Sequence, residues 1–194
     1  MAAWYGLIEA GGTKFLCAVA NEDGELIEQS RLDTRGPTDT FQRVIEFFQP
    51  FLAQEMAQAF GIASFGPLDL DINSATYGHI TATPKPGWAQ IDVLSYLKPH
   101  LSCPIYIDTD VNAAALAELQ WGAGRGLESL VYVTVGTGVG GGYARMGRTH
   151  HGLLHPEMGH MRVPRLEWDS FPGVCPFHGD CIEGLCSGPA IEAR

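Results

Sequence analysis

The chain has 194 residues, of which 45% are hydrophobic and 18% are charged, a balance typical of a globular fold. Its formal net charge of -10 opposes binding to a polyanion, and its 12 Lys and Arg residues are scattered, so we exclude a nucleic acid partner. No run approaches the roughly 18 apolar residues that span a bilayer, and the start lacks the basic and apolar regions of a signal peptide. The sequence predicts a cytoplasmic protein without a membrane partner.

The first third of the chain predicts a meander and a helix. Short apolar runs at 4–8, 14–20 and 26–32 are joined by turns and predict three antiparallel strands. Apolar residues then recur at helical spacing from Thr38 to Leu52, and Pro50 predicts a kink or a break in this helix. A buried strand is expected at 60–65.

The middle of the chain contains a long loop and a change of domain. The segment 69–88 is rich in turn formers and closes with Thr83-Pro84-Lys85-Pro86-Gly87-Trp88, so we expect a rigid loop there. Asp92 is placed to cap a short helix at 93–97, and a strand at 104–108 precedes an alanine-rich helix at 112–121. Because a second strand-rich unit begins here, we predict two domains, 1–107 and 108–194.

Two glycine-rich turns each follow a predicted strand. The first consists of Gly11, Gly12, Thr13 and Lys14, and the second contains Gly136, Thr137 and Gly138 and runs to Gly142, before a return strand at 143–146. Without a Cβ in the way, the backbone N–H groups of such turns can approach phosphate oxygens. Either turn alone is equally typical of a hairpin, but two in one chain favour a nucleotide. Since no helix follows the second turn, we exclude a dinucleotide-binding site.

Two carboxylates and an amide lie where a strand gives way to a helix. Asp108, Asp110 and Asn112 occupy this position, which favours negative charge. A carboxylate here can accept a hydroxyl proton. Asp110 can also cap the helix, which is the commoner role of aspartate before an alanine-rich run. The residues alone leave both interpretations open.

Four residues near the end of the chain have the spacing of a zinc site. The run Cys175-Pro176-Phe177-His178-Gly179-Asp180-Cys181 follows His160 by 15 residues, and together they supply His160, Cys175, His178 and Cys181 as tetrahedral ligands. Glu157 and Glu183 flank these ligands, although exposed surface charge is the usual state of glutamate. Cys17 and Cys103 stand in apolar runs and are interpreted as core residues.

These motifs occur in the order found in sugar kinases of the ROK family, which the sequence resembles across nearly its whole length. They are Gly-Gly-Thr-Lys, Asp-x-Asn before a helix, Gly-Thr-Gly-Val-Gly, Pro-Glu-Met-Gly-His and C-x-x-H-x-x-C-x-Glu-Gly-Leu. The Thr-Pro-Lys-Pro-Gly-Trp loop and the histidine inside the C-x-x-H-x-x-C run resemble the bacterial zinc-containing fructokinases. The resemblance implies an α/β, actin-like ATPase (ribonuclease H-like) fold with two lobes and a sugar cleft between them.

The resemblance also implies a function and assigns roles to residues. It implies transfer of the γ-phosphoryl group of ATP, with Mg²⁺, to a hexose, most closely fructose, with Asp110 as general base. The sugar ligands would be Asn112, Glu157, His160 and Glu183. The phosphate ligands would be Gly11, Gly12, Thr13, Lys14, Gly136, Thr137 and Gly138, and the turn at Pro189 would border the nucleotide. A structural Zn²⁺ would be held by His160, Cys175, His178 and Cys181, with His160 serving both metal and sugar through its two ring nitrogens. A homodimer is expected from the family only.

Three departures from the family and two alternatives accompany this interpretation. Glu9 stands where the family usually has aspartate, and Cys186 stands where a small residue is usual, so we leave Cys186 outside the metal site. The chain ends at Arg194, where family members continue, so we expect an incomplete second lobe and exposed apolar surface on the strand from Leu130.

The alternatives to a hexose kinase are a non-catalytic, zinc-stabilised sugar-binding remnant and a ROK-type sugar-sensing regulator. The regulator needs an N-terminal DNA-binding extension. Within the kinase interpretation, mannose or glucose can replace fructose as the substrate.

Overall fold

The computed structural model of the protein describes residues 3–53, 56–151 and 156–194. The chain divides into two compact units, Met1–Asp110 and Val111–Arg194. This division and the domain boundary expected at 108 both lie where strand β7 (Ile105–Thr109) meets helix α3 (Asp110–Gln120). The assignment of 1–107 and 108–194 as two kinase lobes stays a prediction.

The first unit is built on a five-stranded sheet with the order β3-β2-β1-β4-β7. Its further strands are β1 (Trp4–Ala10), β2 (Lys14–Ala20), β3 (Leu26–Asp33) and β4 (Ala57–Ser64). The first three pair antiparallel, as the meander prediction requires, whereas β4 lies parallel to both β1 and β7. Buried and exposed residues alternate along β1, because successive side chains of a strand point to opposite faces.

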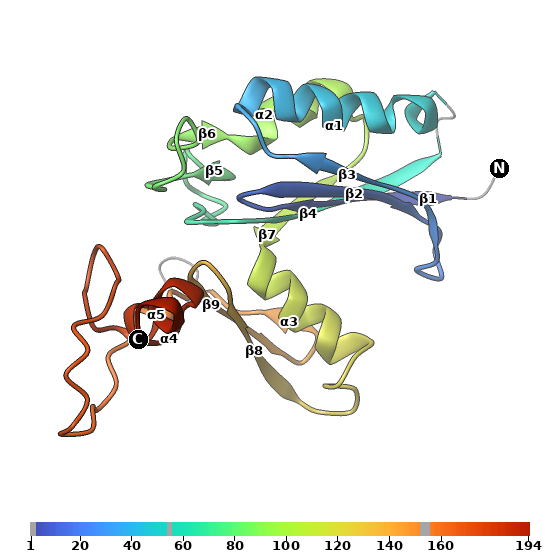
Figure 1. Ribbon diagram of the computed structural model, residues 1–194. Helices are drawn as coiled ribbons and strands as arrows, with labels where there is room; N and C mark the ends of the chain where they lie inside the picture. The colour runs from blue at the N-terminus through green and yellow to red at the C-terminus, as the bar shows by residue number, and fades with distance from the viewer. Residues whose placement is uncertain (1–2, 54–55, 152–155) are drawn as a thin grey trace. The chain divides into compact units, whose positions relative to one another are not determined.

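Two helices lie on one face of this sheet, α1 (Pro37–Leu52) and α2 (Val93–Leu97) (Figure 1). Of the kink or break expected at Pro50, a break is wrong, since α1 continues through Pro50 to Leu52. A proline in the last turn costs the helix only one backbone hydrogen bond, so the turn survives. The prediction for α2 is confirmed, because Asp92 accepts a hydrogen bond from the Ser95 N–H at 3.0 Å. Of the helices that the structure describes, none has the length and apolar character needed to cross a membrane.

The segment 69–88 is mostly loop, but it also takes part in a small ladder. Strand β5 (His79–Ile80) pairs antiparallel with β6 (Ile91–Asp92), and a short 3-10 helix η1 (Lys98–His100) follows α2. The prediction that 69–88 contains no regular element is therefore wrong at His79 and Ile80, which form β5. Two-residue strands carry no detectable period, which is why the sequence does not indicate them.

The second unit combines α3 with a three-stranded sheet of order β10-β9-β8. The elements are β8 (Ser129–Val135), β9 (Val139–Arg145), β10 (Arg148–Thr149), the 3-10 helix η2 (Met158–His160), α4 (Ile182–Cys186) and α5 (Gly188–Ala193). The second glycine turn is shorter than expected, because β9 already begins at Val139. Glycines are required inside this strand by close packing, since a Cβ at Gly142 would overlap the carbonyl of Val111 and one at Gly141 would lie 2.6 Å from Met158 Sδ.

Three valines on β8 leave an apolar face uncovered. Val131, Val133 and Val135 are 53%, 57% and 57% exposed. Leu130 and Tyr132, which point to the other face, pack against the cluster that α3 forms with β9. The exposed apolar surface expected on this strand is therefore present.

Candidate functional site

The first glycine turn joins β1 to β2 in a closed, exposed hairpin. Gly11 N–H donates to the Lys14 carbonyl at 2.9 Å, and a Cβ at Gly11 would lie 2.7 Å from the same oxygen. Thr34, the residue directly after β3, also stabilises the turn, because its hydroxyl group donates to the Gly11 carbonyl at 2.8 Å. A Cβ at Gly12 would meet nothing within 4 Å. The turn is therefore fixed at its base, and its tip is accessible to a ligand.

A lysine that the sequence did not single out contacts this turn. The Lys85 ammonium group donates to the carbonyl of Gly12. The loop that presents it is anchored by Trp88, which is fully buried and whose indole N–H donates to the Arg35 carbonyl at 2.9 Å. Gly87 has a φ of 78°, which a glycine adopts at little cost. The loop motif was recognisable in the sequence, but its contact with a turn 73 residues away was not.

Asp110 is the first residue of α3 and follows directly on β7. Asp108, two residues earlier, accepts a hydrogen bond from the Thr109 N–H at 2.7 Å. Asn112 is fully buried in the second unit, and its side-chain oxygen accepts from the Tyr143 N–H at 3.3 Å. Because this buried amide is hydrogen-bonded to β9, it stabilises the fold even when no substrate is bound.

The second glycine turn is held at both ends by the segment from α4 to α5. The carbonyl of Gly136 accepts from the Gly188 N–H at 2.8 Å, and the N–H of Val139 donates to Glu183 Oε2 at 3.0 Å. A Cβ at Gly138 would lie only 2.5 Å from the same carboxylate oxygen. Thr137, in the middle of the turn, is exposed, as is Pro189 at the start of α5. The turn is thus supported from behind and accessible at its tip.

The four predicted metal ligands come together in the second unit. His160, Cys175, His178 and Cys181 have their donor atoms within 4.8 Å of one another. His160 Nδ1 lies 3.8 Å from Cys175 Sγ and 3.6 Å from Cys181 Sγ, and Cys175 Sγ lies 3.9 Å from His178 Nδ1. Tetrahedral zinc with Zn–S near 2.3 Å and Zn–N near 2.05 Å places sulfur and nitrogen ligands about 3.6 Å apart. The donor set and its spacing fit that ion.

The surroundings of the cluster also suit a cation. Cys175 and Cys181 are buried, and burial raises the pKa of the Cys181 thiol, with Cys175 beside it acting in the same direction. A divalent cation stabilises the thiolate form and so opposes this effect. Because His160 turns Nδ1 to the thiols, Nε2 remains as the nitrogen for a second partner. Glu157 is exposed and precedes η2, and Cys186 lies outside the group.

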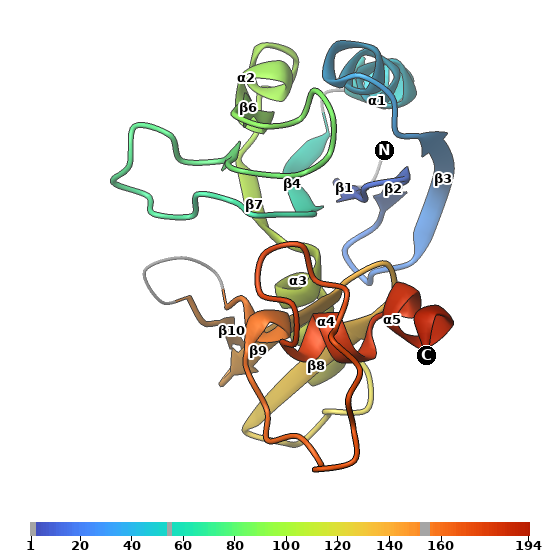
Figure 2. The same ribbon diagram turned by 60° about the vertical axis from the view of Figure 1, so that its left-hand side comes forward.

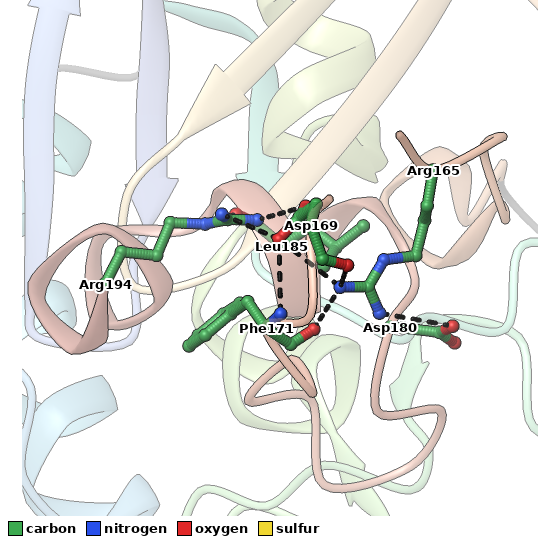
Figure 3. A network of polar contacts seen from close by, with 6 residues as sticks. All are labelled: Arg165, Asp169, Phe171, Asp180, Leu185 and Arg194. Atoms are coloured by element: carbon green, nitrogen blue, oxygen red, sulfur yellow. Dashed lines mark hydrogen bonds and ion pairs between the residues drawn. The ribbon is translucent and has the colours of Figure 1, made fainter. Parts of the chain in front are cut away.

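A network of charged groups ties the loop around these ligands to the last helix (Figure 3). Arg194 donates to both carboxylate oxygens of Asp169, at 3.2 and 3.0 Å, and its guanidinium lies 4.5 Å from the ring centre of Phe171. Arg165 donates to the carbonyls of Asp169 and Phe171 and faces Asp180, which lies between the predicted ligands His178 and Cys181 in the sequence. The hydrogen bonds from Arg194, followed by the one from the Phe171 N–H, lower the pKa of Asp169 to about 2.

Solved structures of other proteins share this fold. A ROK hexokinase from Thermus thermophilus superposes with a TM-score of 0.79 at 28% identity, over 98% of this chain and 62% of that one. A ROK family glucokinase from Streptomyces griseus, solved in complex with glucose and AMPPNP, gives a TM-score of 0.70 at 26% identity, over 98% of this chain and 59% of that one. The fold is that of the actin-like ATPases, as the sequence predicted.

The family assignment follows from sequence comparison. The family model described as "ROK family" matches residues 5–194, and the chain belongs to this family. It is 50% identical to a fructokinase from Zymomonas mobilis over 98% of this chain, and 46% identical to one from Lactococcus lactis over 100% of this chain. The chain spans 64% and 65% of the length of these relatives.

Proposed function

We propose that the protein is an ATP-dependent hexose kinase that converts fructose to fructose 6-phosphate. The observation that carries the proposal is identity of 46–50% to fructokinases along essentially the whole chain. Two glycine turns with accessible tips and an aspartate at the junction of β7 and α3 support it, because they supply phosphate donors and a carboxylate base. The cytoplasmic location and the homodimer stay predictions.

In the proposed reaction Asp110 acts as the general base. Its carboxylate accepts the proton of the 6-hydroxyl group of fructose while the hydroxyl oxygen bonds to the γ-phosphorus of ATP. The bond from that phosphorus to the β–γ bridging oxygen breaks, and ADP leaves. When bound, Mg²⁺ neutralises charge on the phosphoryl oxygens. The contribution of Asp110 to the reaction is to accept the proton of this hydroxyl group.

The glycine turns act on the phosphates through their backbone. We propose that both turns bind phosphate oxygens through N–H groups, those of Gly12, Thr13, Lys14, Thr137 and Gly138. Gly11 and Gly136, whose N–H groups donate to the carbonyls of Lys14 and Gly138 at 2.9 Å, form the base of each phosphate site. The accessible tip at Gly12 and the anchored ends of the second turn support this role. Pro189 opens α5 directly after Gly188, which contacts the second turn, and we place it at the border of the nucleotide.

The sugar and the metal share one residue in the proposed site. Asn112, Glu157, His160 and Glu183 bind the remaining hydroxyl groups of the sugar. Zn²⁺ would be held by His160, Cys175, His178 and Cys181 in a structural role. Nδ1 of His160, which faces the two thiols, would serve the metal, and Nε2 would serve the sugar. The donor set of two thiols and two imidazoles supports zinc over the harder cations, which prefer oxygen ligands.

The test is an ATP-dependent phosphorylation assay with fructose, mannose and glucose. We expect turnover that is highest with fructose and lost by at least 100-fold in Asp110→Asn, because removing a general base costs about 10²–10⁴-fold. Asp108→Asn is the matched control and retains turnover. A protein that binds fructose but phosphorylates no hexose would support the sugar-binding alternative instead.

A further inference from the structure

Strand β9, which begins at Val139 directly after the second glycine turn, lies beside α4 (Figure 2) and also contacts η2. The backbone of Val139 is held between these two segments, which carry predicted metal ligands. On one side is η2, where a Cβ at Gly159 would overlap the Val139 carbonyl, and where His160 is the next residue. On the other side is α4, whose Glu183 accepts from the Val139 N–H at 3.0 Å and whose N-cap residue is Cys181. The backbone of Val139 therefore contacts both segments that the metal would join.

The two segments also contact each other and the start of the turn. The N–H of Ile182 donates to the Met161 carbonyl at 2.9 Å, which connects the residues directly after Cys181 and His160. Beyond α4, the Gly188 N–H donates to the Gly136 carbonyl at 2.8 Å. The short segment 181–188, which begins at the predicted ligand Cys181, is thus hydrogen-bonded to both ends of the turn.

The fit around Glu183 leaves little room for other arrangements. A Cβ at Gly138 would lie 2.5 Å from Glu183 Oε2, so only a glycine allows the carboxylate to reach the Val139 N–H. A carboxylate acceptor makes this hydrogen bond stronger than one between neutral groups. The bond uses Oε2, which leaves Oε1 to accept from a sugar hydroxyl. One side chain can therefore serve the sugar and the turn.

We propose that the metal centre positions the second phosphate turn and that Glu183 is the positioning residue through which it acts. By binding His160 and Cys181 together, the ion fixes η2 relative to α4 and so fixes the carboxylate that orients the Val139 amide. The Val139 N–H is occupied by Glu183, so its part is to fix the end of the turn. The amides of the turn that are not engaged in this way then bind phosphate oxygens without a further ordering cost. The inference rests on the proposed function, because it takes the turn as a phosphate site.

The first test compares amide hydrogen exchange in the full chain with zinc bound and after chelation, with zinc content measured by atomic absorption. Loss of zinc is expected to speed exchange at Val139 and Gly188 by about tenfold or more, the factor associated with losing a charge-assisted hydrogen bond. Helix α3 serves as the reference for a folded second unit and keeps its protection. Unchanged exchange at Val139 in protein shown to have lost zinc would overturn the proposal.

The second test keeps the zinc and removes the carboxylate. Glu183→Ala is expected to retain zinc, to speed Val139 exchange and to weaken Mg·ADP binding by about fivefold to tenfold. Glu183→Gln restores both properties, because its amide oxygen also accepts from the N–H. Glu192→Ala on α5 is the matched control and behaves as wild type. Wild-type exchange in Glu183→Ala, or loss of its zinc, would contradict the assigned role.

The two tests separate this inference from the proposed function. Amide exchange reports the connection between metal and turn whether or not the protein phosphorylates a sugar. If the wild-type chain binds no Mg·ADP while Val139 exchange still follows zinc content and Glu183, the nucleotide role fails and the connection stands. If Mg·ADP binds with the same affinity with and without zinc, the positioning role is refuted.

Discussion

Replacing Trp88 tests whether a buried indole holds the loop that presents Lys85 to the first glycine turn. Trp88 is fully buried, and its ring centre lies 5.7 Å from both Phe15 and Phe41 and 5.4 Å from Phe65. Its N–H donates to the Arg35 carbonyl at 2.9 Å. The side chain therefore contributes both packing and one hydrogen bond to the first unit.

The expected cost follows from these two contributions. Truncation of a buried aromatic side chain to alanine costs about 3–5 kcal/mol, so Trp88→Ala should remove much of the stability of the first unit. Trp88→Phe keeps an aromatic ring but loses the N–H and leaves a small void. We expect a loss of about 2 kcal/mol, roughly half from the hydrogen bond and half from the void.

Urea unfolding followed by far-UV circular dichroism measures the loss. Trp168→Phe is the control, since Trp168 is 78% exposed and its replacement should change the free energy of unfolding by less than about 0.5 kcal/mol. If Trp88→Phe costs no more than this control, the indole does not anchor the loop and the reasoning is refuted.

Three further outcomes are expected. Lys85→Met should weaken Mg·ADP binding or lower kcat/KM by about tenfold, because a charge-assisted contact is lost, whereas Lys98→Met on η1 should change neither. Cys175→Ser should abolish zinc binding measured by atomic absorption, whereas Cys186→Ser should keep one ion per chain. The pKa of Asp169 is lowered from 3.8 to about 2 in the folded protein, so its carboxylate stabilises the fold fully above about pH 4 and loses this effect as the pH falls through 2. Asp169→Asn should therefore lower the Tm at pH 7, and its difference from wild type should shrink between pH 4 and pH 2.

Errors of prediction arose where an element's end depends on its surroundings. Pro50 predicts a kink or a break by its covalent structure, and α1 does not break there, because a last turn tolerates the loss of one hydrogen bond. The run after Gly138 was expected to be turn as far as Gly142, but β9 begins at Val139. Close packing of β9 against α3 and η2 leaves no space for a Cβ at Gly142 and Gly141, so this strand needs glycines there.

The sequence by itself determined the features that depend on neighbouring residues. Glycine turns after strands, an aspartate cap before α2 and the ligand spacing from Cys175 to Cys181 follow local rules of backbone freedom, capping and coordination. Only the tertiary structure decided the contacts that support the turns. Lys85 and Gly12 are 73 residues apart, and Glu183 and Val139 are 44 residues apart. Such pairs are set by how whole elements pack, and no local pattern in the chain encodes them.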